Sequence, residues 1–258
     1  MPKLTFQPLK GWRPFLGEVG IIVLGVLIAL GLGEVARTIG LRSDTREARN
    51  AISLELGEAL GTAIERSRFS PCVDRRLDAL AIIVDQAATD GRLPPLGDIR
   101  SPPVRAWNHG IWDSIVSAQT AAHFNREELN AYVAAYDYVV NLDETNRPEL
   151  AAWTMLYSLV GPGRSLTPGE AIALRGAIGE ARVASRGMAL QSLRLQQRVD
   201  AYDLPFNRAA MLEFSERPLS NKEICQPIDG EVPAHYGQSP FRTTLDRARK
   251  SPIKRITH

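Results

Sequence analysis

The sequence has few of the residues on which most catalytic and metal sites depend. It contains four histidines and two cysteines in 258 residues. No two histidines have the i, i+4 spacing or the HExxH setting of a metal-binding helix. The GxSxG nucleophile motif and the glycine-rich loops that hold phosphates are also missing. The residue pattern therefore predicts no catalytic residue, no metal and no cofactor.

A large excess of charge of either sign is missing as well. The chain has 31 basic and 29 acidic residues and a formal net charge of +2, so we expect no general attraction to nucleic acid. The exception is the segment 238–258, where basic residues outnumber acidic ones. This segment is expected to be a basic, disordered tail. It is either a solvated terminus or an arm that touches anionic lipid or another polyanion.

A long apolar run distinguishes the N-terminal part of the chain. The 15 residues Val19 to Gly33, between Glu18 and Glu34, are uncharged. Their helix would rise only ~22 Å against a hydrocarbon core of ~30 Å, but apolar flanks extend the segment. We predict a cytoplasmic tail over residues 1–14 and a transmembrane helix over residues 15–39. A cleaved signal peptide and a buried soluble helix are the alternatives.

The charges that flank the apolar run do not orient it, because basic residues before and after it nearly balance. A short leading segment without acidic residues favours an N-terminus in the cytoplasm, and a long folded domain can be translocated largely regardless of its charge. We therefore expect the domain after the helix to lie outside the cytoplasm.

Small residues recur every four positions in the apolar run. Gly25, Ala29 and Gly33 share one helix face, and Glu18 falls on nearly the same face. The pattern indicates either a packing face for a homodimer or another membrane protein, or the ordinary frequency of glycine in membrane helices. The expected partners are the lipid bilayer and one of these proteins.

The two cysteines, Cys72 and Cys225, lie far apart and outside any metal-like spacing. In an extracytoplasmic domain they would form one disulfide, worth on the order of 4 to 5 kcal/mol for so long a loop. In the cytosol they would be two reduced core thiols. Their oxidation state therefore indicates the side of the membrane on which the domain lies.

Helix start signals recur along the rest of the chain, and no segment alternates like a strand. The predicted starts are Asp44, Ser70, Ser101, Asn125, Pro148 and Thr167. The longest helix runs from Thr167 toward Pro205. Its predicted packing face is Leu174, Ile178, Ala181, Ser185, Met188, Ser192, Leu195, Val199 and Tyr202.

These patterns predict an all-α protein. The transmembrane helix precedes an antiparallel helical-bundle domain over residues 44–237. That domain ends in an irregular strap from residue 218, anchored by Cys225.

One polar pair stands out in the helical domain. His109 and Asp113 are separated by four residues, so they meet across one helical turn. They are either an ordinary surface or core pair or, in a tethered hydrolase, an oriented general base.

Three segments together resemble a known family: Gly17-Glu18, then Gly25-Val26-Leu27-Ile28-Ala29-Leu30, then Trp112-Asp113-Ser114-Ile115 before a tyrosine-bearing helix. The chain resembles bacterial single-pass envelope proteins of unknown function, whose membrane helix carries Gly-Glu before Gly-Ile-Leu-Ile-Ala-Leu. The likeness is specific over about 20 residues and loose across the helical domain. It implies no known activity.

Three functions follow as hypotheses. The first is a bacterial inner-membrane protein whose periplasmic helical domain binds a partner or senses a ligand. The second is a membrane-tethered hydrolase centred on His109 and Asp113. The third is a structural subunit of a membrane complex that uses the face of Gly25, Ala29 and Gly33.

Overall fold

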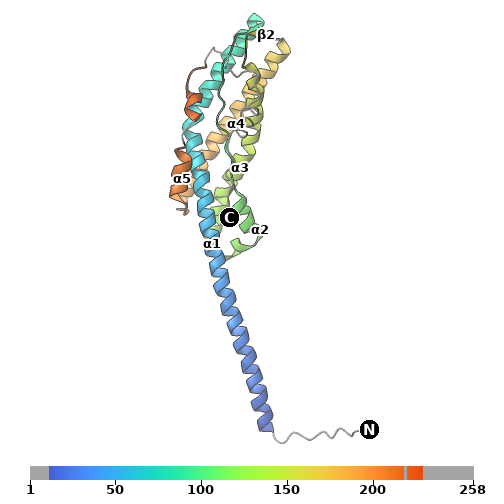
Figure 1. Ribbon diagram of the computed structural model, residues 1–258, viewed down its shortest axis with the longest axis vertical. Coiled ribbons are helices and arrows are strands. Elements are labelled where there is room, and N and C mark those ends of the chain that lie inside the picture. The colour runs from blue at the N-terminus through green and yellow to red at the C-terminus, as the bar shows by residue number, and fades with distance from the viewer. Residues whose placement is uncertain (1–11, 218–219, 229–258) are drawn as a thin grey trace, which may run out of the picture.

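The computed structural model of the chain describes residues 12–217 and 220–228, and it confirms the all-α prediction (Figure 1). Two short strands, β1 (Arg92–Leu93) and β2 (Arg164–Ser165), form one antiparallel pair. Single 3₁₀ turns cover Thr120–His123, Tyr157–Leu159 and Ser220–Cys225. The helices are α1 (Trp12–Asp90), α2 (Gly110–Ser117), α3 (Arg126–Leu156), α4 (Pro168–Ala201) and α5 (Arg208–Ser215).

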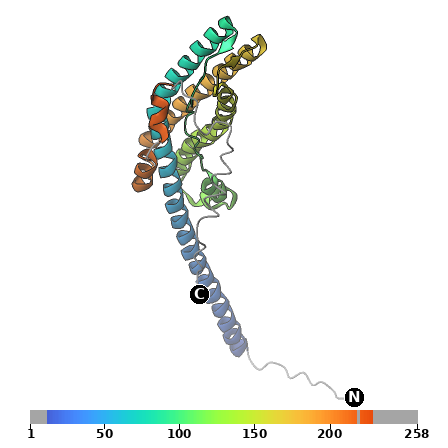
Figure 2. The same cartoon turned by 45° about the horizontal axis from the view of Figure 1, so that its top comes forward.

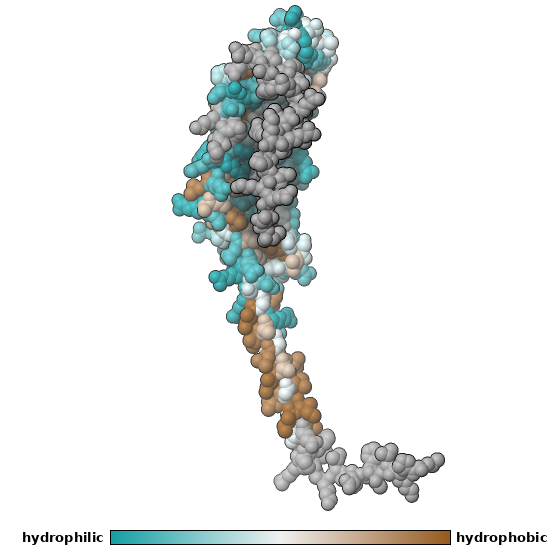
Figure 3. Space-filling view, viewed as in Figure 1, coloured by the Kyte–Doolittle hydropathy of each residue, from teal (hydrophilic) through white to brown (hydrophobic). Residues whose placement is uncertain are grey.

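The longest helix, α1, has 79 residues and is therefore ~120 Å long. Its N-terminal part stands away from the other helices in both ribbon views (Figures 1 and 2). The apolar run in this part is exposed and forms the brown surface of Figure 3. Among the described residues, α1 is the one helix long and apolar enough to cross a membrane, by length and composition.

The helix starts predicted at Asp44 and Ser70 are wrong, because α1 continues through both. Thr45 and Ser70 donate their hydroxyls to the carbonyls four residues earlier instead of capping a new helix. Pro71 removes one helical hydrogen bond, but the apolar residues on either side of it remain packed in the core, and that packing outweighs the loss. The helix also begins at Trp12, inside the predicted tail, whose residues 1–11 lie outside the described part.

Other boundaries were predicted with mixed success. Asn125 and Thr167 do cap α3 and α4, since their side chains accept from the backbone N–H groups of Glu128 and Glu170. The start predicted at Pro148 is wrong, because α3 runs through this residue. The start at Ser101 is also wrong: residues 101–109 are not helical, and α2 begins at Gly110. Helix α5 was not predicted.

Ion pairs between helices define their directions. Arg175 and Arg182 of α4 contact Asp85 and Asp78 of α1 at 2.7 and 2.6 Å, so α4 runs antiparallel to α1. Contacts of Arg49 and Arg66 of α1 with α3 residues 128 and 149 show that α3 runs parallel to α1. The three long helices therefore lie side by side around the core, and α5 packs on α1.

The core consists of two apolar clusters with a charged layer between them. On α1 the clusters cover residues 48–63 and 69–87, and Arg66 lies between them. Glu149 of α3 and Ser185 of α4 occupy the corresponding gaps on their helices. Arg66 donates to both carboxylate oxygens of Glu149, at 2.8 and 2.6 Å, and to the Ser185 hydroxyl at 3.1 Å. The two charged side chains are only 7% and 4% exposed, so this layer joins three helices inside the protein.

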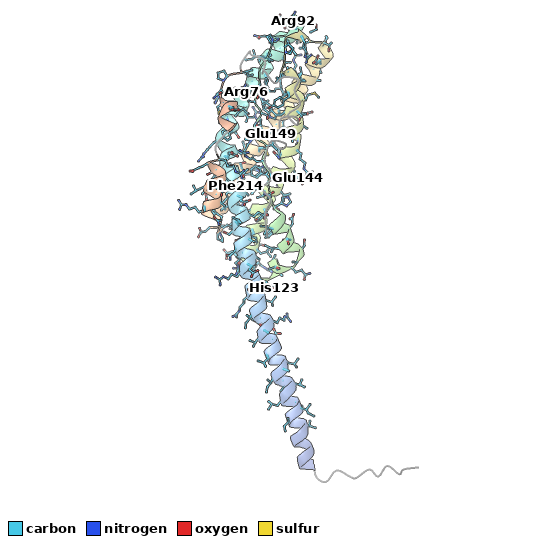
Figure 4. All side chains as sticks on the ribbon, in the orientation of Figure 1. Arg76, Arg92, His123, Glu144, Glu149 and Phe214 are labelled. Carbon is cyan, nitrogen blue, oxygen red and sulfur yellow. A yellow bond between two sulfur atoms is a disulfide. The ribbon has the colours of Figure 1, made fainter. Side chains whose placement is uncertain are left out.

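The disulfide predicted between Cys72 and Cys225 is present, with the two Cα atoms 4.8 Å apart. It ties the C-terminal strap to the middle of α1. Arg76, labelled in Figure 4, is buried one turn further along α1 and donates to the strap carbonyls of Ile224 and Gln226. The described part of the strap, residues 220–228, is thus fixed both covalently and by hydrogen bonds. The predicted basic tail, 238–258, lies outside the described residues.

The charged layer gives a test of what holds α1 and α3 together. Glu149→Gln leaves the Arg66 charge buried without its carboxylate, which we expect to destabilise the fold by ~3–5 kcal/mol. Asp143→Asn breaks the exposed pair with Arg147 on the same helix and should cost less than about 1 kcal/mol. Denaturant unfolding of the full chain in detergent, followed by circular dichroism, measures both. Equal losses for the two variants would show that the buried pair does not hold the helices together.

Candidate functional site

A groove between α3 and α4 is the largest apolar concavity on the described surface. Its volume is about 730 Å³, and it lies on the outside of the two helices. Helix α3 contributes Glu144, Thr145 and Pro148, of which Glu144 is labelled in Figure 4. Helix α4 contributes Arg175, Gly176, Gly179, Glu180, Val183, Ala184 and Gly187.

Helix α4 carries apolar residues on two opposite faces. The predicted inner face is buried from Leu174 to Val199, although Tyr202 is 46% exposed because α4 has ended before it. The outer face consists of Ile172, Gly176, Gly179, Val183 and Leu190. Ile172 is 68% exposed and Val183 is 75% exposed. A helix that is apolar on both sides is suited to pack against something on each.

Glycines on two helices show how unusual the outer face is. On α1, a Cβ atom at Gly57 or Gly61 would lie only 2.4 Å from a backbone oxygen of the segment that carries α5. These glycines therefore allow α5 and its preceding turn to approach α1 closely. A Cβ atom at Gly176 or Gly179 would meet nothing within 4 Å. Each of these two glycines weakens α4 by about 1 kcal/mol without any packing gain inside the chain.

The rim of the groove is charged. Glu144 and Glu180 line it, and Arg186 is exposed one turn beyond Val183. None of these three side chains forms a hydrogen bond or ion pair with the described part of the chain. Arg175 reaches away to Asp85 at 2.7 Å. The groove thus has an apolar floor with unpaired charges of both signs beside it.

The structure brings the predicted pair His109 and Asp113 together. Nδ1 of His109 lies 2.7 Å from Oδ2 of Asp113, at the N-terminus of α2. The described residues give His109 no second hydrogen bond to a hydroxyl or thiol that it could activate. Nor do three His, Cys, Asp or Glu side chains gather among them as a metal site would require. The pair is placed as predicted, but its surroundings add no support for a hydrolase.

A buried carboxylate near this pair was missed from the sequence. Glu55 accepts hydrogen bonds from the backbone N–H groups of Ile111 and Trp112 and from the Tyr136 hydroxyl. The negative charge thereby caps the first turn of α2. Burial, together with the Glu55 charge, raises the pKa of Tyr136, and burial raises the pKa of Tyr132 to about 12. Trp112 stacks on Tyr136 with ring centroids 4.9 Å apart, so this cluster is structural.

The small-residue face of the anchor is open in a single chain. Gly25, Ala29 and Gly33 are exposed, and a Cβ atom at either glycine would meet nothing within 4 Å. The side chain of Glu18, predicted on the same face, lies outside the described part. Packing of this face against another helix therefore stays a prediction.

No protein-family model, no curated protein and no solved structure matches the chain. The resemblance to bacterial single-pass envelope proteins therefore stays a prediction. The function has to be argued from the geometry of this chain alone.

The groove could have been found from the sequence. The outer-face residues of α4 are spaced by four, three, four and seven, as expected for one helix face. We followed only the stronger inner stripe, which has more large aliphatic residues. A second apolar stripe half a turn away from the first is the signal that was overlooked.

The two glycine pairs make a matched test. Gly57→Ala forces a Cβ atom against the backbone of Asn207, and we expect a net loss of ~1–3 kcal/mol from overpacking. Gly176→Ala meets open space and should instead stabilise the chain by ~0.5–1 kcal/mol. Denaturant midpoints of the two full-length variants give the comparison. A loss of stability in Gly176→Ala would mean that the groove is filled from within the chain.

Proposed function

We propose that this chain is a single-pass membrane protein of the bacterial inner membrane whose periplasmic helical domain docks a helix of a partner protein. The groove between α3 and α4 is the docking site. The observation that carries the proposal is the exposed outer face of α4, where two glycines and Val183 form an apolar floor that no part of the described chain covers.

The exposed apolar part of α1 supports the anchor. Water does not favour so many aliphatic side chains on an isolated helix, and a bilayer does. The disulfide supports a location outside the cytoplasm, because disulfides persist in oxidising compartments such as the periplasm. Together they favour an N-terminus inside the cell and a domain outside the inner membrane.

The shape of the groove favours a helix as its occupant. It is open along the two helices that form it, so it would leave much of a small molecule in water, whereas binding pockets enclose most of a ligand's surface. A helix can lie along it and bury one apolar stripe, as helix-in-groove complexes do. Within this chain, Gly57 and Gly61 already show how a glycine pair admits the close approach of another helix.

A second copy of the chain fits the groove less well than a different protein. A two-fold dimer centred on this site would place groove against groove, and two concave surfaces do not fill each other. If both anchors enter one membrane, the two-fold axis follows the membrane normal and Arg186 approaches its own copy. A partner helix with a convex apolar stripe and a carboxylate opposite Arg186 avoids both problems.

The rigid α1 helix also sets the height of the groove. Arg182, beside the groove, pairs with Asp78 of α1, and Asp78 lies 39 residues beyond Ile39. At 1.5 Å per residue, the groove is ~60 Å along α1 from the end of the anchor. The partner is therefore a soluble periplasmic protein or a membrane protein with a long external domain.

Topology is the first test. A C-terminal alkaline phosphatase fusion should be active, because the domain is expected in the periplasm. Cys72 and Cys225 should react with a maleimide only after reduction, since they form a disulfide. Control cells carry Cys72→Ser, whose remaining thiol should label without reductant. An inactive fusion together with two freely reactive thiols in the parent chain would place the domain in the cytoplasm.

Docking is the second test. A photo-crosslinking amino acid at Val183 of the full chain should give an adduct with one partner, mapped to a single helix of that partner. Filling the groove with Gly176→Leu and Gly179→Leu should reduce the adduct at least about tenfold, equivalent to 1.4 kcal/mol. These variants should fold, because the new side chains enter open space.

Two controls decide the interpretation of the adduct. Gly169→Leu adds the same bulk to α4 outside the groove and should leave the adduct unchanged. Crosslinking from Ile82, an exposed apolar residue of α1, should not capture the same partner helix. An adduct with a second copy of this chain, or one that survives the filled groove, would contradict the proposal.

A further inference from the structure

A small basic pocket lies where α1 enters the folded domain. Its volume is about 350 Å³, and its lining is Thr38, Leu41, Arg42, Thr45 and Arg49 of α1 with His123 from the turn before α3. Figure 4 labels His123 at the lower end of the domain, beside the start of the free part of α1. The lining contains three groups that can carry positive charge and no carboxylate.

The cationic groups of this pocket differ in how far the chain already satisfies them. Arg49 donates through Nε and Nη2 to Glu128, at 2.8 and 2.9 Å, and lies over the ring of Phe124. Arg42 and His123 are exposed, and neither forms a hydrogen bond or ion pair with the described residues. Arg49 is therefore fixed, while Arg42 and His123 have donors available for an anion.

Nearby carboxylates do not neutralise the pocket. Glu128 is occupied by Arg49, and Glu34 lies 3.9 Å from Arg37, two turns nearer the N-terminus than Arg42. Asp44 and Glu47 occupy the opposite face of α1 by helical periodicity. The remaining acid in this region, Glu127 at the start of α3, lines a different concavity with Tyr202 and Asp203.

The pocket lies at the height of lipid headgroups. Val26 is the middle of the uncharged run, and Arg42 is 16 residues further along α1, which is ~24 Å from the bilayer centre. Headgroups extend to ~20–22 Å from that centre. Because helical side chains point toward the N-terminus, the Arg42 guanidinium reaches back toward the membrane. Leu41 and the methyl groups of two threonines provide the apolar side that a lipid needs.

We infer that the pocket formed by Arg42, Arg49 and His123 binds the phosphate headgroup of an anionic phospholipid. Arg42 donates to the phosphate oxygens, His123 closes the pocket from the domain side, and the pre-positioned Arg49 adds its remaining Nη1 donor. The bound lipid is a second attachment of the domain to the membrane. This inference rests on the membrane anchor in the proposed function but not on the groove.

The test measures lipid binding by the full chain after delipidation in detergent. Native mass spectrometry with phosphatidylglycerol and phosphatidylcholine gives the two affinities. We expect tighter binding of phosphatidylglycerol by the parent chain. Arg42→Gln with His123→Gln should lose that preference by about fivefold, the effect of one basic group near a membrane surface. Both residues are exposed and unpaired, so the variant should retain the parent circular dichroism.

Matched controls separate the pocket from general charge. Arg92→Gln removes one exposed arginine at the opposite end of the domain, where Figure 4 labels it, and should bind phosphatidylglycerol as the parent chain does. An equal loss in Arg92→Gln, or a preference that survives the double variant, would overturn the inference. Competition by millimolar inorganic phosphate would instead identify a site for a free anion. A chain that stays soluble without detergent would refute the anchor itself, independently of the lipid affinities.

Discussion

Helix α1 has to satisfy two solvents without a break, and the rest of the structure depends on that constraint. Its first part is exposed and apolar, as a bilayer requires, and from Thr45 onward one of its faces is buried against protein. Helices α3, α4 and α5 all pack on that second part or on each other. Because no loop separates the two parts, the direction of the anchor also fixes the direction of the domain.

The charged layer of Arg66, Glu149 and Ser185 sets the register of the three long helices. Apolar packing alone tolerates a shift of one helical turn, since another leucine or alanine then takes the same place. A buried bidentate ion pair does not, because a shifted Arg66 would face one of the two apolar clusters without a carboxylate. We interpret the layer as a device for specificity rather than for net stability.

Local sequence signals predicted the features that depend on a few neighbouring residues. The all-α class, the caps at Asn125 and Thr167, and the inner face of α4 each follow from spacing over one or two turns. The cysteine pairing was predictable because only two cysteines exist.

The errors came from tertiary packing, which overrides local signals. Ser70-Pro71 has the form of a helix start, but the helix continues because its apolar face on both sides is already buried. The long-range contacts of Arg66, of Glu55 and of the groove join residues more than 25 positions apart. No pattern within one helix reports them, apart from the second apolar stripe on α4.

A single membrane helix would leave the height and tilt of the domain poorly defined, because a helix in a bilayer tilts readily. The groove lies ~60 Å along α1 from the anchor, so a tilt of 20° moves it sideways by ~20 Å. A lipid bound at Arg42, near the pivot, limits that tilt by holding the base of the domain against the headgroups. The lipid site and the groove are then mechanically related: the first defines where the second stands when a partner arrives.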